Sequence, residues 1–236
     1  MIHRSTPGFL LWHLAIPLAG FALALFLLEQ LPVDLWLADR WYALQGGAWA
    51  WRDSWLAYEL IHHHGKQFII AVGVVLLGLF AASYRVERLR RYRRLIGYVL
   101  SCMALLPSLI ASSKRFSPVP CPWDLQRYGG DEIYRHNFEY AFGAAASGHC
   151  FPAGHASAGF ALLAVYFAAL PFARRPAWYL LPGLAVGWIF ALGQQARGAH
   201  FLSHDLWTAA LCWFGALGLF FAFRLRGWVP QESLSP

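Results

Sequence analysis

Six apolar runs, each between 15 and 20 residues long, dominate the sequence. An α-helix rises about 1.5 Å per residue, so a run of this length covers most or all of the roughly 30 Å hydrocarbon core of a bilayer. We therefore predict an all-α fold: a polytopic membrane protein with six transmembrane helices in one integral membrane domain, residues 1–236. The predicted spans are Phe9–Leu28, Phe68–Ser83, Leu95–Ser112, Ala156–Phe172, Trp178–Leu192 and Leu206–Phe223.

Arginine is distributed unevenly among the segments that connect these runs. The connections 84–94, 174–176 and 224–226 are rich in arginine, and the first of them alone contains six. Cytoplasmic loops of membrane proteins carry such an excess of Lys and Arg, so we place these connections and both termini in the cytoplasm. The same span count places three polar segments together on the non-cytoplasmic face: 30–66, 113–155 and 193–205.

The composition argues against a soluble domain and against a nucleic-acid partner. Hydrophobic residues make up 58% of the chain and charged residues 13%, whereas soluble domains carry about 25% charged residues. A net charge of +7 can indicate nucleic-acid binding, but here the arginines cluster in connections between apolar runs. We therefore expect no nucleic acid, and expect the lipid bilayer to surround the chain.

The first apolar run also has features of a secretory signal peptide, because His3 and Arg4 precede it. It is long, however, and ends at Glu29-Gln30 without a small-residue cleavage site. We therefore predict a retained helix.

The polar segment 30–66 disperses its charged residues among tryptophans. This spacing predicts an amphipathic helix on the membrane interface over Trp51–His62. His62, His63 and His64 are consecutive, and one interpretation of such a cluster is a metal site. Three consecutive histidines cannot all face one ion on a helix, so we favour a polar helix end at the interface.

The pentapeptide Phe151-Pro152-Ala153-Gly154-His155 predicts a turn that leads into a helix. Gly154 permits close backbone approach, and the helix N-terminus presents free N–H groups with partial positive charge. Such a site can hold a phosphate oxygen, and His155 in the first turn can donate a proton to a leaving group. The alternative is a simple helix entry with an interfacial histidine.

His200 is the candidate nucleophile in the polar segment 193–205. An imidazole attacks phosphorus through one nitrogen when an acceptor holds the N–H of the other. Asp205 or His204 could supply that acceptor if Ser203 caps the sixth helix.

The cations Arg197 and Lys114 would neutralise phosphate oxygens as charge develops. Two other interpretations stay open. Arg197 could instead pair with Asp205 at a polar helix end, or His200 and His204, one helical turn apart, could bind a metal ion. No acidic residue follows His200 as hydrolytic zinc helices require, so we expect no metal.

These segments resemble, in order, the motifs of the type 2 phosphatidic acid phosphatase superfamily of integral membrane phosphatases: Lys-x6-Arg-Pro, Pro-Ser-Gly-His and Ser-Arg-x5-His-x3-Asp. Lys114 is followed at the right distance by Cys121-Pro122, so a cysteine replaces the arginine of the first motif. The second motif is Pro152-Ala153-Gly154-His155, which departs from the family only at Ala153.

In the third motif His200 takes the histidine position, while Gln194 takes that of the arginine and His204 that of the aspartate. Arg197 lies about one turn from Gln194, and Asp205 is one residue past His204. Arg197 is therefore a candidate for the missing arginine. The group that orients His200 is His204 by position or Asp205 by chemistry, and we favour Asp205 because a carboxylate stabilises an imidazolium better than a neutral ring does.

The resemblance covers residues 95–223, which it implies are the catalytic core. It implies that His200 attacks phosphorus and forms a phosphohistidine, and that His155 protonates the leaving oxygen. Lys114 and Gly154 are implied to bind phosphate. No metal and no cofactor are implied.

Cys121 stands where the family has a phosphate-binding arginine, and Cys150 lies five residues before His155. Both are predicted on the non-cytoplasmic side, where disulfides persist. We hypothesise that they form a disulfide between the first-motif loop and the second motif, the alternative being two unpaired buried residues. Cys102 and Cys212 lie in apolar runs and are expected to act as small hydrophobic residues.

The resemblance implies a metal-independent phosphatase that hydrolyses a lipid phosphate or pyrophosphate ester at the headgroup level. A phosphohistidine can also react with an alcohol, so a lipid phosphotransferase is an alternative. A non-enzymatic transporter or scaffold with a degraded site is a third, supported by the departures at Cys121, Ala153 and Gln194. The arginine asymmetry fits a bacterial inner membrane with the site facing the periplasm or exterior.

Overall fold

The computed structural model describes residues 6–141 and 148–225, and the regular elements of these residues are helices. His3, Arg4 and Arg226, which contribute to the predicted orientation of the chain in the membrane, lie outside the described residues. The long helices are α2 (Ile16–Gln30), α3 (Val33–Leu44), α4 (Gly65–Ala82), α6 (Arg93–Lys114), α10 (Leu181–Ala196) and α11 (Leu202–Ala222). The shorter helices are α1 (Thr6–Leu10), α5 (Glu87–Arg90), α7 (Asn137–Ala141), α8 (Gly154–Phe160) and α9 (Ala164–Ala169). The π-helical segments are η2 (Leu11–Ala15) and η3 (Trp55–His64), and the 3-10 segments are η4 (Pro122–Asp124), η5 (Gln126–Tyr128), η6 (Ala161–Leu163) and η7 (Pro176–Leu180).

Five helices among the described residues are long and apolar enough to cross a membrane, so the chain is an all-helical integral membrane protein. They overlap the first, second, third, fifth and sixth predicted spans. The fourth predicted span falls on a shorter apolar helix, Gly154–Ala169, which comprises α8, η6 and α9. The five long helices are Pro7–Gln30, Trp55–Ala82, Arg93–Lys114, Pro176–Ala196 and Leu202–Ala222.

The predicted interfacial helix over Trp51–His62 is wrong. Helical structure begins at Trp55 and continues without a break through η3 and α4 to Ala82. Gly65 lies within this helix and directly against the ring of Phe190, where a Cβ would come within 2.6 Å of Cε1. At 1.5 Å per residue the helix is about 42 Å long, so it exceeds the roughly 30 Å apolar layer and can carry polar residues in its first turns.

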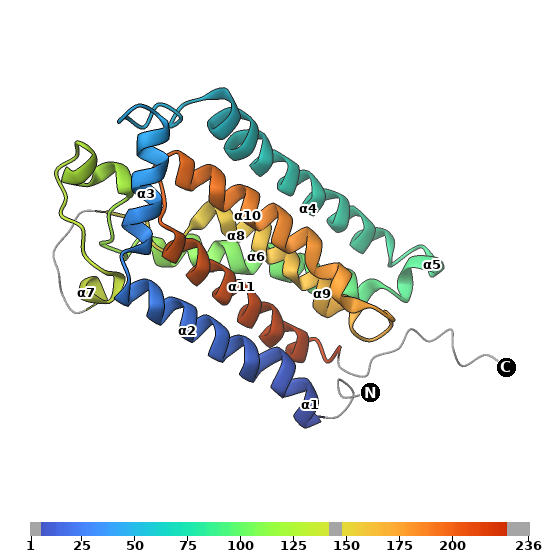
Figure 1. Cartoon of the computed structure of the whole chain (residues 1–236). Helices are drawn as coiled ribbons and strands as arrows, with labels where there is room; N and C mark the ends of the chain where they lie inside the picture. The colour runs from blue at the N-terminus through green and yellow to red at the C-terminus, as the bar shows by residue number, and fades with distance from the viewer. Residues whose placement is uncertain (1–5, 142–147, 226–236) are drawn as a thin grey trace.

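The long helices lie side by side, with polar connections at both ends (Figure 1). At one end, which we call the site end, α3 crosses the bundle beside α7 and the loop that follows α6. At the other end lie α5, the turn after α9 and the end of α11. The segment around α5 contains the six clustered arginines, so these arginines lie at the end opposite α3.

The short helix Gly154–Ala169 lies inside the bundle, against α6, α10 and α11. Its Phe160 and Phe167 have no exposed surface. The outer helices Pro7–Gln30 and Trp55–Ala82 bury far fewer side chains, as expected of helices that present apolar surface to lipid. Because protein surrounds the central helix, its ends are covered by other parts of the chain, and its first residues can take part in a polar site.

Glycines allow the central helix to approach α10 closely. A Cβ on Gly159 would lie 2.5 Å from the backbone nitrogen of Gly187, and one on Gly187 would overlap the ring of Phe160. Four residues earlier, a Cβ on Gly183 would come within 2.6 Å of the backbone nitrogen of Leu163. Small residues spaced four apart are a common means of bringing membrane helices into backbone contact.

This contact predicts that Gly187→Ala destabilises the protein by about 1–3 kcal/mol, because the added methyl group overlaps a ring in a packed core. The measurement is thermal unfolding of the purified protein in detergent. Gly78→Ala is the matched control, since Gly78 is also in a membrane helix and a Cβ there meets nothing within 4 Å. Equal unfolding temperatures for the two variants would contradict this packing role.

Candidate active site

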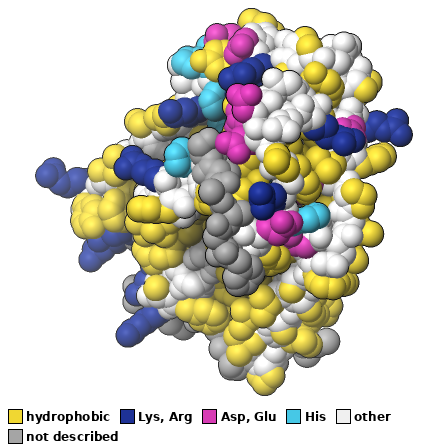
Figure 2. All heavy atoms as spheres, turned by 90° about the vertical axis from the view of Figure 1, so that its left-hand side faces the viewer, with side chains coloured by type: hydrophobic (Ala, Val, Ile, Leu, Met, Phe, Trp, Pro, Cys, Tyr) yellow, Lys and Arg dark blue, Asp and Glu magenta, His cyan; other side chains and the backbone are white. Residues whose placement is uncertain are grey.

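The three segments that resemble the family motifs meet at the site end of the bundle. Lys114 is the last residue of α6, Gly154 and His155 begin α8, and His200 lies in the turn between α10 and α11. Figure 2 shows this end, where acidic, basic and histidine side chains gather among hydrophobic ones. The side chain of Lys114 extends to Gly154, because a Cβ built there would lie 3.8 Å from Cδ of the lysine.

His200 is almost completely buried, with 5% of its surface exposed. Burial lowers the pKa of its imidazole well below the ordinary value, and the charge of Lys114 acts in the same direction. His200 is therefore neutral near pH 7, which leaves a lone pair on one ring nitrogen. Its Nδ1 has no hydrogen-bond partner among the described residues.

Neither of the two predicted acceptors holds Nδ1 of His200. Asp205, fully buried, accepts a hydrogen bond from Gln195 Nε2 on α10 at 2.8 Å. The ring of His204 is fully buried and lies edge-on to that of His200, with centroids 5.8 Å apart, and no hydrogen bond joins the two rings. His204 is thus a ring neighbour of His200, whereas the observed partner of Asp205 is Gln195.

The first turn of α11 is capped by a residue distant in the sequence. Ser203 does not cap this helix as predicted, because the N-cap residue is Phe201 and Ser203 lies inside the first turn. The backbone N–H of Ser203 instead donates to Asp34 Oδ1 on α3 at 2.9 Å. A carboxylate is favourable at a helix N-terminus, so α3 helps to fix the turn that bears His200 and His204.

His155 is held by α10 and η3. Its Nε2 lies 3.2 Å from the carbonyl oxygen of Ile61, which can only accept, so this nitrogen carries a proton. One face of the ring stacks on Phe190 with centroids 4.3 Å apart. The ring of His62 is equally close, at 4.4 Å.

Arg197 does not pair with Asp205 but turns toward η3. Its Nε donates to the carbonyl oxygen of Arg52 at 2.6 Å, and its Nη1 donates to Gln194 Oε1 at 3.1 Å. The guanidinium also lies over the ring of Tyr58, 4.9 Å from its centroid. Arg197 therefore contacts the residue that occupies the family's arginine position.

His62 is a site residue that the sequence analysis missed. Gln194 Nε2 bonds its Nδ1 at 2.8 Å, and its ring lies beside that of His155. His63 and His64 are exposed. The only sequence signal was that three consecutive helical residues must point in different directions, and that signal does not say which one faces the site.

The predicted disulfide between Cys121 and Cys150 is present, and it joins the loop after α6 to the segment before α8. The backbone N–H of Cys150 also donates to the carbonyl of Val119 at 2.9 Å. In the described part of the chain, Asp124 and these two cysteines form the one group of three whose possible metal-ligand atoms lie within 4.8 Å of one another. Both sulfur atoms of this group belong to the disulfide. Buried, unpaired Cys102 and Cys212 match the prediction for them.

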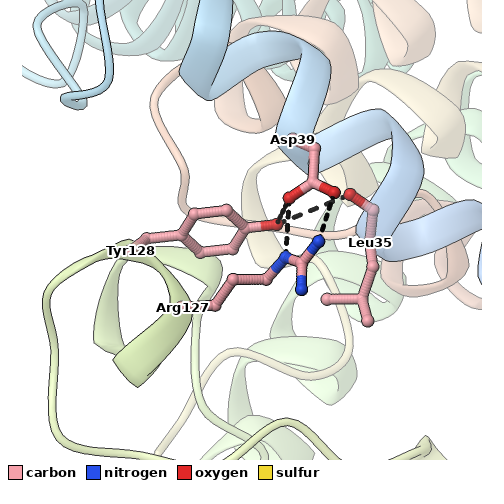
Figure 3. Close-up of polar contacts among 4 residues, drawn as sticks. All are labelled: Leu35, Asp39, Arg127 and Tyr128. Atoms are coloured by element: carbon pink, nitrogen blue, oxygen red, sulfur yellow. Dashed lines mark hydrogen bonds and ion pairs between the residues drawn. The ribbon is translucent and has the colours of Figure 1, made fainter.

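An ion pair ties the same loop to α3 (Figure 3). Nε and Nη2 of Arg127 each lie 2.7 Å from a carboxylate oxygen of Asp39, and the hydroxyl of Tyr128 donates to Oδ1 at 2.9 Å. These bonds lower the pKa of Asp39 below its ordinary value. The pair is partly exposed, so its main effect is to hold the loop in position rather than to add much stability.

A comparison with protein-family models finds a match to the PAP2 superfamily over residues 95–228, more than half of the chain. This region contains Lys114, Gly154, His155 and His200 but excludes α3 and η3. No curated protein and no solved structure matches the chain.

The burial of the Asp34 carboxyl predicts a pH-dependent effect of Asp34→Asn on stability. Burial raises the pKa of Asp34 from 3.8 to about 6. A raised carboxyl pKa stabilises the folded state below pH 3.8, and this stability, about 3 kcal/mol, is lost as the pH rises through 6. The free energy of unfolding of Asp34→Asn relative to wild type should therefore increase from pH 4 to pH 7.

Unfolding in detergent at these two pH values measures the change. Asp39→Asn is the control with the opposite sign, because the pKa of Asp39 is lowered and its stabilising effect is present only at the higher pH. A pH-independent difference between wild type and Asp34→Asn would show that the buried carboxyl does not titrate as stated.

Proposed function

Because the chain belongs to the PAP2 superfamily, the type 2 phosphatidic acid phosphatases, we propose that it hydrolyses a phosphate or pyrophosphate ester of a membrane lipid. The superfamily assignment makes it a phosphatase-type hydrolase acting on phosphate esters, and its apolar helices embed it in a membrane. The observation that carries the lipid-phosphatase proposal is the neutral, buried His200 in a turn that also faces Lys114 and the start of α8.

In this proposal the phosphate is bound by Lys114, by Arg197 and by the N-terminus of the central helix at Gly154. Lys114 lies against Gly154, so its ammonium group and the first N–H groups of the central helix can approach the same oxygens. Arg197 adds a second cation, whose charge is only partly compensated by the carbonyl and amide oxygens that it contacts. Oxygens of a phosphate gain most from such donors when charge develops in the transition state.

The chemical step begins with attack by the unprotonated nitrogen of His200 on phosphorus. The N–P bond forms as the bond between phosphorus and the lipid oxygen breaks. His155 then supplies a proton to that oxygen from Nδ1, because its Nε2–H is bonded to the carbonyl of Ile61. The negative phosphate beside His155 favours the protonated imidazolium that this transfer requires.

In the second step water attacks the phosphohistidine and releases inorganic phosphate. His155, now neutral, accepts the proton of the water molecule, and His200 is regenerated. A lipid alcohol in place of water would give phosphoryl transfer. His204 and Asp205 are both proposed to position His200 without bonding to its Nδ1: His204 packs edge-on against its ring, and Asp205 accepts from Gln195 on α10.

The position of the site suits a substrate that remains in the membrane. Lys114, Gly154 and His155 are only half-buried, and all three lie at the ends of helices. The clustered arginines lie at the opposite end of the bundle, which supports a cytoplasmic location for that end and a non-cytoplasmic location for the site. A bacterial inner membrane, with the site toward the periplasm or exterior, fits this arrangement.

His200→Ala should lower phosphate release at least about a thousandfold, because no covalent intermediate forms without the nucleophile. The assay measures phosphate released by purified protein from a panel of lipid phosphates and pyrophosphates. His149→Ala is the control: His149 is exposed in the same polar region, and its Nδ1 lies 3.1 Å from the carbonyl oxygen of Ser117.

Equal release by wild type and His200→Ala would remove His200 from the mechanism. Absence of release from every lipid by the wild type, with no phosphoryl transfer to an alcohol, would favour a non-enzymatic membrane scaffold.

A further inference from the structure

The histidine triplet divides into one inward and two outward side chains. His62 is half-buried, with its ring centroid 4.4 Å from that of His155. His63 and His64 are exposed and contact the same side chain, Gln67, at 3.0 and 3.1 Å. The family match begins at residue 95, so His62 comes from a helix outside the matched region.

The hydrogen bonds of Gln194 determine the tautomer of His62. Nη1 of Arg197 can only donate, so the amide atom 3.1 Å from it must be the oxygen of Gln194. The amide nitrogen then faces His62 and donates to its Nδ1 at 2.8 Å. A neutral His62 therefore carries its proton on Nε2, and this N–H makes no hydrogen bond among the described residues.

The same turn of η3 holds His155 from two sides. The carbonyl of Ile61 accepts from Nε2 of His155, and the next residue supplies the neighbouring ring. His62 is therefore placed beside the group assigned to protonate the leaving oxygen. A phosphate within reach of His155 is also next to His62.

The charges near His62 favour an anionic ligand. Arg197, Lys66 and Lys114 all lie close enough to interact with it electrostatically. Among the described residues, His62 has no ion pair with a carboxylate. A neutral N–H donor on which three cations act electrostatically is a suitable environment for a phosphate oxygen.

We infer that His62 is a phosphate-binding residue of this site, which donates from Nε2–H to an oxygen of the phosphate that His200 attacks. This inference rests on the function proposed above. Gln194 occupies a position where the family has arginine, and its amide cannot provide the charged fork of a guanidinium. Hydrogen bonds join Arg197 to Gln194 and Gln194 to His62. In this way a donor from a neighbouring helix takes the place of the missing arginine.

The test is direct binding of inorganic phosphate and of orthovanadate to the full-length protein in detergent, measured by calorimetry without turnover. His62→Ala should bind both anions at least about tenfold more weakly, because a hydrogen bond to a charged group is lost. His63→Ala and His64→Ala are matched controls and should stay within about twofold of wild type. His62→Gln, which retains an N–H donor, should recover most of the affinity.

A spectroscopic measurement reports the tautomer independently. In the 15N spectrum of histidine-labelled protein, the imidazole signals that disappear in His62→Ala should show a protonated Nε2 and an unprotonated Nδ1. Gln194→Leu should alter these signals, because the donor to Nδ1 is removed.

Three outcomes would overturn the inference: unchanged anion affinity in His62→Ala, an equal loss in all three alanine variants, or a neutral His62 protonated on Nδ1. These outcomes leave the proposed function intact, because it is tested separately by His200→Ala. If wild-type protein bound neither anion, the His62 inference and the phosphate site would both fail.

Discussion

The close approach of α10 to the helix that begins at Trp55 determines which side chains reach the candidate site. A Cβ on Gly193 would lie 2.7 Å from Cγ2 of Ile61, so a larger residue at position 193 would separate the two helices. With glycine there, the carbonyl of Ile61 meets His155 and the ring of His62 meets Gln194. The glycines of α10 that face the central helix also bring α10 close to the helix that begins with Gly154 and His155. Helix α10 thus packs closely against both the helix that begins at Trp55 and the central helix Gly154–Ala169, which carry His62 and His155.

The departures from the family motifs have different structural consequences. Cys121 replaces a phosphate-binding arginine and forms a disulfide with Cys150, so that position constrains a loop instead of supplying charge. Gln194 replaces a second arginine, and its amide accepts a hydrogen bond from Arg197 and donates one to His62. A site can retain its donors when a family residue is lost, provided that another element approaches closely enough to replace it.

Hydropathy and charge predicted most of the bundle because both act locally along the chain. The lengths of the apolar runs predicted the long helices. The number of spans between the motifs predicted that Lys114, His155 and His200 lie at one end of the bundle. The failures involve contacts between distant residues. The backbone N–H of Ser203 is capped by Asp34, and Gly65, inside the helix from Trp55, packs against the ring of Phe190. No periodicity in the sequence reports such contacts.

The central claim is that His200 forms a covalent bond to phosphorus, and rapid quenching in base tests it most directly. Wild-type protein mixed with a lipid phosphate labelled with radioactive phosphorus should give an acid-labile, base-stable label on the peptide that contains His200. The label should appear before free phosphate and disappear as phosphate is released. Label on another peptide, or rapid phosphate release with no labelled protein at any time, would contradict the account.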